Sequence, residues 1–235
     1  LPLAIPAYIL AFVYVGIMDY GGEFQSIFGF RIDIFNIYGV IFVLSMSLYP
    51  YVYMLAKTAF KSESKAIYEV GKINGYSEFS IFYKVSIKLA MPSILAGLML
   101  VLMEVLSDYG ASAYLGVDTF SAGIFKTWYD LGDAYSSSAL SAILMIFVFM
   151  LMYIEYKQRQ KSKFSFNQDI SDFITKRNLN RFKSIIAMVY CLIILFIGFI
   201  LPFLWLGYWG LRDYKLFEID FYILSLNSLI LAGIA

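Results

Sequence analysis

The chain has 235 residues, of which 61% are hydrophobic and only 15% are charged, whereas soluble domains average about 45–50% apolar and about 25% charged residues. This composition excludes a soluble globular protein and an intrinsically disordered one, and a net charge of +1 gives no reason to expect a nucleic-acid partner. A single cysteine and no histidine argue against a disulfide framework, a metal site or a histidine general base, so we expect an integral membrane protein that holds no metal or other cofactor.

Six apolar runs predict transmembrane helices. In chain order they cover residues 1–18, 35–56, 91–107, 134–154, 184–211 and 221–235. About 20 apolar residues cross the hydrocarbon core as a helix, and continuous rather than alternating runs favour helices over barrel strands. The fold class is therefore an all-α, polytopic helix bundle. Because the sixth run is short, we expect the sequence to be an internal piece of a longer protein, with the last span incomplete and the first left open.

The charges of the loops predict the orientation of these spans. In chain order, the net charges are −2 for residues 19–34, +3 for 57–90, −3 for 108–133, +5 for 155–183 and −1 for 212–220. Basic residues mark cytoplasmic loops of membrane proteins. We therefore expect the second and fourth loops to lie in the cytoplasm and the other three to lie outside.

The loop of residues 57–90 is long and carries two helix patterns. Apolar residues at helical spacing precede Asn74 and Gly75, which are typical of a helix end. Ser77 and Glu78 then predict a new helix start, and Pro92 suits the opening turn of the next span. The pattern predicts two short amphipathic helices joined by a glycine elbow. Such a pair could lie in the lipid interface or dock into a groove of a cytoplasmic partner.

The spacing within this loop resembles the EAA loop of ABC-importer permeases. That pattern is Glu-Ala-Ala, three residues, Gly, nine residues, Ile, one residue and Leu-Pro, and its counterparts here are Glu69, Gly71, Gly75, Val85 and Ile87. Val70 and Gly71 stand where the family has alanines, and Lys88 stands where proline is usual. The resemblance implies that these positions form a coupling loop for an ATPase.

Other parts of the chain resemble the ferric-iron branch of these permeases, notably residues 1–22, 48–60 and 102–132. The resemblance implies a first permease unit in residues 1–155, a cytoplasmic linker in 156–183 and the start of a second unit in 184–235. It also implies a multi-pass protein of the bacterial plasma membrane that contacts the lipid bilayer, two cytoplasmic ATPase subunits and an extracytoplasmic substrate-binding protein. The implied substrate is ferric iron, although permeases for thiamine, polyamines and sulfate share the architecture.

One carboxylate lies well inside a predicted span. Glu104 is followed one helical turn later by Asp108, which would share its face, and Tyr109 is adjacent. A carboxylate within the bilayer costs about 2.5–3.5 kcal/mol on insertion scales, so we expect Glu104 to face the bundle interior or water. Glu104, Asp108 and Tyr109 are candidates for a translocation path. The alternative is a helix end with a structural hydrogen bond.

The chain lacks the G-x-x-x-x-G-K-[ST] motif of a P-loop and every common hydrolase motif. We therefore expect no enzyme activity in this subunit and ATP hydrolysis on a separate one. The main alternative is an ion-gradient-driven secondary transporter or channel, which typically has broken helices near the bilayer midplane.

Overall fold

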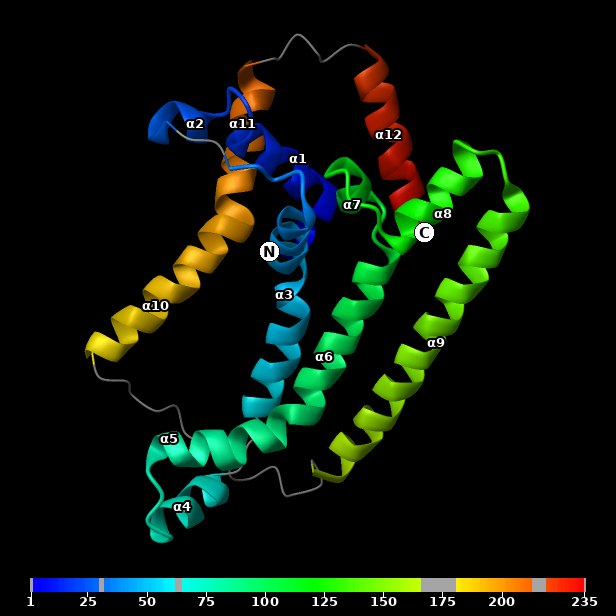
Figure 1. Cartoon of the computed structure of the whole chain (residues 1–235). Helices are drawn as coiled ribbons and strands as arrows, with labels where there is room; N and C mark the ends of the chain where they lie inside the picture. Colours follow the sequence, from blue (N-terminus) through cyan, green and yellow to red (C-terminus); the bar gives the residue numbers. More distant parts are fainter. Residues whose placement is uncertain (1, 30–31, 62–64, 166–180, 213–218, 235) are drawn as a thin grey trace.

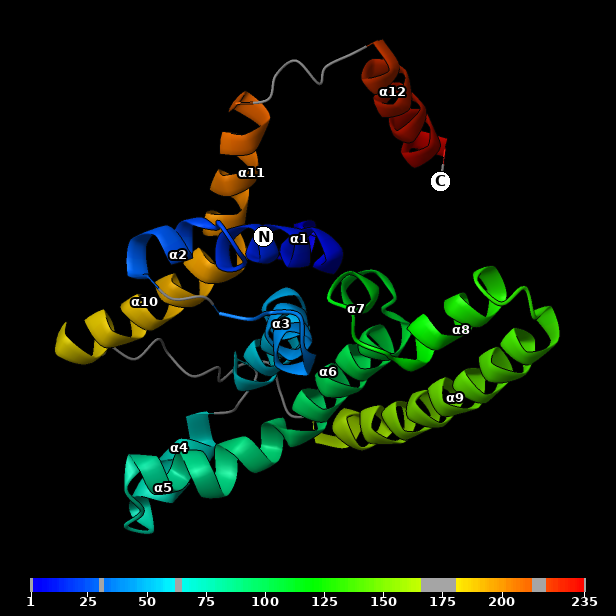
Figure 2. The same cartoon turned by 45° about the horizontal axis from the view of Figure 1, so that its top comes forward.

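Residues 2–29, 32–61, 65–165, 181–212 and 219–234 are described in the computed structural model of the chain. Within these ranges the regular structure is helical and contains no strand, which confirms the predicted all-α class. In both views α3 (Ile37–Lys61) and α6 (Ile87–Ser107) lie in the middle of the molecule (Figure 1, Figure 2). The helix α9 (Ala134–Ser165) flanks them on one side, and α10 (Arg181–Leu195) lies on the other.

Four helical stretches are long and apolar enough to cross a membrane: Ile37–Lys61, Glu78–Ser107, Ala134–Lys157 and Arg181–Arg212. They confirm four of the six predicted spans. The first run instead forms η1 (Pro2–Ala4) and α1 (Ala7–Met18). At 1.5 Å per residue the 12 residues of α1 reach about 18 Å, less than the roughly 30 Å of hydrocarbon. The last run forms the 16-residue helix α12 (Ile219–Ile234).

The hydrophobic core lies where α1, α3 and α7 (Gly110–Tyr114) meet. Buried side chains from the three helices and from the residues that flank them form it: Ile5, Leu10, Ala11, Tyr14, Ile34, Val40, Val43, Leu44, Leu48, Ala111 and Leu115. By contrast, only 6% of the most apolar window of α9 is buried, and the same holds for α10 through α11. The apolar outer faces of these helices suit contact with lipid.

Helices α3 and α6 approach each other closely at Gly97. A Cβ atom at this position would lie 2.8 Å from the Cα of Val52 on α3. Small residues permit this kind of backbone approach between membrane helices. At its N-terminal end α3 has a side-chain cap, because the Gly39 N–H donates to the Asn36 Oδ1 at 3.0 Å.

The loop between α3 and α6 holds α4 (Lys65–Ile73) and α5 (Glu78–Ile81). The predicted helix start at Glu78 is confirmed, but the second helix is not short. It continues through the π turn η2 (Phe82–Ser86) into α6, and it places Pro92 inside the helix rather than in an opening turn. In Figure 1, α5 lies across the lower end of the molecule and α6 rises from it. A π turn and an internal proline are both recognised causes of such a bend.

After α6 the chain forms α7, α8 (Phe120–Tyr129) and α9. The side chain of Thr119 caps α8, and Asp133 caps α9 by accepting from the Ser136 hydroxyl and amide. These hydrogen bonds lower the pKa of Asp133. The predicted boundary at residue 155 falls within α9, which runs to Ser165, and residues 166–180 of the predicted linker lie outside the described residues.

The fourth long helix is bent at a π turn. Helix α10 continues through η3 (Phe196–Ile200) into α11 (Leu201–Arg212), which has Pro202 in its first turn. The Leu201 N–H donates to Phe196, one residue beyond the usual partner, and Pro202 has no N–H to donate. The Ile197 carbonyl therefore lacks a helical donor. It accepts instead from the Tyr14 hydroxyl of α1 at 2.6 Å.

The two ends of the molecule carry different loops. Figure 1 places α4 and α5 together with the C-terminal end of α9 at the lower end. It places α2 (Glu23–Phe28), α7, α8 and the C-terminal end of α11 at the upper end. The predicted cytoplasmic loops thus share the lower end in their described parts, and the predicted outer loops share the upper one.

Candidate functional site

The turn between α4 and α5 has the hydrogen bonds of a Schellman motif. The Tyr76 N–H donates to the Gly71 carbonyl at 3.1 Å, and the Gly75 N–H donates to the Lys72 carbonyl at 2.9 Å. Gly75 has a φ of +76°, which side-chain-bearing residues rarely adopt. Ser77 then caps α5, because its hydroxyl accepts from the Ser80 N–H at 3.3 Å. We call residues 69–81 the elbow.

Side-chain packing also fixes the angle of the elbow. Gly71 is buried on α4 and faces the buried Ile81 at the end of α5. A Cβ atom on Gly71 would lie 2.8 Å from the Cγ1 and 2.9 Å from the Cδ1 of Ile81. The glycine that replaces the second alanine of the EAA pattern is therefore the residue that lets Ile81 pack against α4. The Lys72 Nζ and the Glu78 Oε1, 3.8 Å apart, add an exposed ion pair.

The outer side of the elbow is apolar and exposed. Ile73 is 84% exposed and Phe79 is 73% exposed. Val70, Tyr76 and Tyr83 are exposed beside them in the chain, and Glu69 is an exposed residue of α4. A protruding apolar helix end of this kind fits a groove on another protein.

Val85 and Ile87 lie away from the turn. Val85 is part of the π turn η2 and Ile87 begins α6, and both are half-buried. Next to them Phe82 stacks on Phe60 of α3, with ring centroids 5.9 Å apart. The second part of the EAA-like pattern thus lies where the elbow joins α3 and α6.

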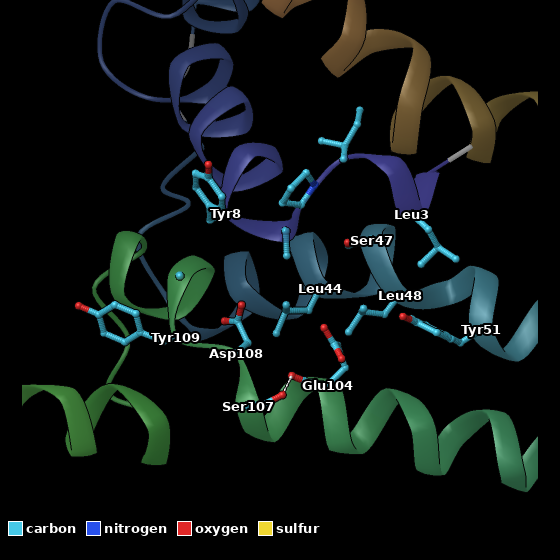
Figure 3. A pocket seen from close by; sticks show the side chains of 14 residues that line it. Leu3, Tyr8, Leu44, Ser47, Leu48, Tyr51, Glu104, Ser107, Asp108 and Tyr109 are labelled. Atoms are coloured by element: carbon cyan, nitrogen blue, oxygen red, sulfur yellow. Dashed lines mark hydrogen bonds between the residues drawn. The ribbon is translucent and has the colours of Figure 1, made fainter. Parts of the chain in front are cut away.

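A cavity of about 320 Å³ lies at the other end of α6 (Figure 3). Three segments line it: the η1–α1 region, α3, and the end of α6 with the start of α7. Its lining residues are Leu3, Ile5, Pro6, Ala7, Tyr8, Leu44, Ser47, Leu48, Tyr51, Glu104, Ser107, Asp108, Tyr109 and Gly110.

The Glu104 side chain rises from α6 toward Leu44 and Leu48 of α3 (Figure 3). It is exposed, and in the described part of the chain no hydrogen bond or ion pair engages its carboxylate. Glu104 thus faces a cavity between helices, whereas the sequence predicted that it faces the bundle interior or water. The prediction that it contacts substrate stays a prediction.

Asp108 lines the same cavity but has a structural role. Helix α6 ends at Ser107, and Asp108 follows it directly as the C-terminal cap, on the side of the helix that lines the cavity with Glu104. Its carboxylate accepts from the Ser112 N–H at 3.1 Å and from the Ser112 hydroxyl at 2.8 Å. It also faces the Ala111 N–H at 3.4 Å. Asp108 thus caps α7.

Tyr109 stacks on Phe125 of α8, with ring centroids 4.2 Å apart. Its ring is directed away from Glu104 (Figure 3). Two residues that the sequence did not single out lie across from Glu104 instead, Ser47 and Tyr51 of α3. Their spacing of four residues puts them on one helix face, but only the packing of α3 against α6 shows that this face meets Glu104.

Comparisons with known proteins agree with this architecture. The family model described as "Binding-protein-dependent transport system inner membrane component" matches residues 1–160. The chain is 27% identical over 146 residues, 62% of its length, to the Fe(3+)-transport system permease protein FbpB 2 of Haemophilus influenzae. It is 28% identical over 116 residues, 48% of its length, to the putative molybdenum transport system permease protein YvgM of Bacillus subtilis.

The matched regions span 26% of the first relative and 51% of the second. The family match covers more than half of this chain and includes the elbow, α6 and most of α9. Four apolar helices of spanning length are what a multi-pass inner-membrane protein requires. The chain therefore belongs to the family of inner-membrane components of binding-protein-dependent transport systems.

Proposed function

We propose that this chain belongs to the permease subunit of an ATP-driven importer, with the elbow as its coupling element. Cytoplasmic ATPase subunits, two by resemblance to the family, receive the elbow in a groove. An extracytoplasmic binding protein delivers the substrate at the opposite end. The observation that carries the proposal is the geometry of residues 69–81, which present an apolar surface on a rigid turn at the end with the basic loops.

Rigidity matters because coupling requires the ATPase and the membrane helices to move together. ATP shifts the permease between conformations only if the docked element differs between them. The elbow continues without a break into α6, so displacement of the elbow moves the helix that carries Glu104.

We propose ferric iron as the substrate. The support is the likeness of residues 1–22, 48–60 and 102–132 to iron-type permeases and the similarity to FbpB 2, which is named for Fe(3+) transport. The similarity to a putative molybdenum permease has a comparable identity over a shorter region. Uptake measurements with iron and with molybdate are therefore needed to identify the substrate.

The test of coupling uses the complete protein, expressed with the genes around it and purified in mild detergent. The variant is Gly75→Val, because valine is strained at a φ of +76°. We expect an ATPase subunit to co-purify with the parent and its affinity for the variant to fall about ten-fold or more, since backbone strain costs about 1–3 kcal/mol. Uptake of radioactive iron by cells should fall in parallel.

The matched control is Gly132→Val. Gly132 has a φ of +65° and equally open surroundings, but it lies in the turn between α8 and α9 at the opposite end. It should keep the ATPase. The proposal fails if no ATPase binds the parent, and transport driven by an ion gradient alone would then favour a secondary transporter.

A further inference from the structure

We propose that the cavity between α1, α3 and α6 is a transient binding site for a hard, multiply charged cation on the transport route. Glu104 supplies the charge, and the Ser47 and Tyr51 hydroxyls supply neutral oxygen ligands. The inference rests on the proposed function, because it puts cargo on the importer's route. It narrows the candidate path from Glu104, Asp108 and Tyr109 to Glu104 and two residues of α3.

The charge of the cavity favours a cation. Its lining contains two carboxylates, Glu104 and Asp108, and no lysine or arginine. The Asp108 carboxylate is engaged by the start of α7, whereas that of Glu104 has no partner among the described residues. Glu104 is exposed to the cavity, so its carboxylate is accessible to a cation that enters there.

Ser47 gives independent support for a ligand. It is only 5% exposed, yet its hydroxyl makes no hydrogen bond with any described residue. Serines inside helices commonly donate to the carbonyl four residues back, as Ser138 does to Ala134 at 2.7 Å and Ser141 to Ser137 at 2.9 Å. The oxygen itself keeps accessible surface and lines the cavity opposite Glu104.

The donor set identifies the class of cation. Carboxylate and hydroxyl oxygens are hard ligands, and the lining has no cysteine, histidine or methionine for a soft metal. In Figure 3 the Tyr51 hydroxyl is turned toward the side of the cavity that holds Glu104. No group of three or more acidic, histidine or cysteine side chains that could hold a metal occurs in the described ranges. One carboxylate and two hydroxyls would bind a cation weakly, which suits a transport route, since cargo must leave as well as enter.

The same charge disfavours an anion. An oxyanion such as molybdate would meet the Glu104 carboxylate with no cation in the lining to offset the repulsion. The cavity thus separates the two cargo classes that the relatives' names suggest, and it favours the ferric ion.

The binding test uses terbium(III), a hard trivalent cation whose luminescence is excited through a nearby tyrosine. The sample is the complete purified transporter in detergent. We expect Glu104→Gln to lower the terbium affinity of the tightest tyrosine-sensitised phase about ten-fold or more. The substitution removes the negative charge that would contact the ion directly. Asp130→Asn removes one exposed carboxylate outside the cavity and should leave this phase unchanged.

Two α3 variants locate the bound ion. Tyr51→Phe should lower the tyrosine-sensitised emission per bound ion while directly excited terbium still reports binding. Ser47→Ala should weaken binding a few-fold without lowering the emission at saturation. Equal terbium affinity in Glu104→Gln and the parent would overturn the proposal.

The transport arm compares uptake of radioactive iron and radioactive molybdate in cells that express the whole system. We expect iron uptake that Glu104→Gln reduces, with unchanged ATPase binding. Molybdate uptake without iron uptake would overturn the cation assignment while leaving the ATP-driven importer intact. Loss of ATPase binding in the parent would instead refute the proposed function, because the terbium measurement does not depend on it.

Discussion

The elbow and the cavity lie at opposite ends of α6 and are built in different ways. The elbow is made by residues 69–81 alone, through a glycine turn, a serine cap and one glycine–isoleucine contact. The cavity is made by three segments far apart in the sequence, near residues 3–8, 44–51 and 104–110. The elbow is thus a local structure that can move as one piece, whereas the cavity exists only while α1, α3 and α6 stay packed.

Mutations in the elbow and in the walls of the cavity should therefore have different effects. Changes in the elbow should alter coupling and leave the membrane helices intact. Changes in the walls of the cavity should alter either stability or cargo binding, depending on whether the residue holds the walls together or faces the space between them.

Gly97→Leu should have the largest effect on stability. The added side chain meets the α3 backbone at Val52, which cannot rotate away, so overpacking should cost about 3 kcal/mol. We expect a lower thermal unfolding midpoint in detergent and loss of the cavity. Gly207→Leu on α11 is the control, because nothing lies within 4 Å of a Cβ there. Equal midpoints for the two variants would contradict the close α3–α6 contact.

Gly71→Ala should destabilise the elbow locally by about 1–3 kcal/mol, because its methyl group overlaps the buried Ile81. Hydrogen exchange in a peptide covering residues 69–81 should speed up, while the midpoint of the whole protein changes little. The Ile81→Ala substitution makes room for the methyl group. The double variant Gly71→Ala/Ile81→Ala should therefore exchange more slowly than Ile81→Ala alone. If the exchange spreads into α3 and α6, the elbow is not a separate unit.

Asp108→Ala should lower the free energy of unfolding by about 1–2 kcal/mol, since it removes the cap of α7. Glu104→Gln, also on the cavity wall, should leave the thermal midpoint unchanged. The pair separates a structural carboxylate from a functional one. Similar losses of stability for both variants would return Glu104 to the structural alternative.

Tyr14→Phe should have the smallest of these effects, about 1 kcal/mol, because it removes one hydrogen bond to the Ile197 carbonyl. That carbonyl has lost its helical donor to the π turn and Pro202. This hydrogen bond joins the predicted first permease unit, residues 1–155, to the start of the predicted second unit, residues 184–235. Chemical denaturation in mixed micelles measures the loss, and a neutral result would mean that water replaces the tyrosine.

The sequence predicted what local chemistry controls. Apolar runs gave the four long spans, and Asn74, Gly75 and Ser77 marked the turn and the new helix, because capping depends on a few adjacent residues. The continuous helix from Glu78 to Ser107 was missed. Pro92 suggested an opening turn, but a proline is tolerated inside a long membrane helix where a π turn and the neighbouring helices accommodate the bend.

The cavity was predicted only in part. Glu104 was recognisable because a charge inside an apolar run is costly. Ser47 and Tyr51, the α3 residues that line the cavity across from it, carry no such signal, since a serine and a tyrosine in an apolar run are common. The structural role of Asp108 was also missed, because the short helix α7, whose start Asp108 caps, was not predicted. Which helix faces meet depends on packing over a long sequence separation, and no local pattern records it.

Docking of the elbow on an ATPase can be measured by cross-linking. Ile73→Cys, at the 84% exposed end of α4, would be placed in a complete transporter freed of other reactive cysteines, including Cys191. Leu131→Cys, 72% exposed at the opposite end, is the control. We predict that a short bismaleimide joins Ile73→Cys to an engineered cysteine in the ATPase groove, with a yield that changes with ATP, and does not join Leu131→Cys. Equal yields at both positions, or none at Ile73→Cys while the ATPase is bound, would show that the elbow does not dock in the ATPase groove.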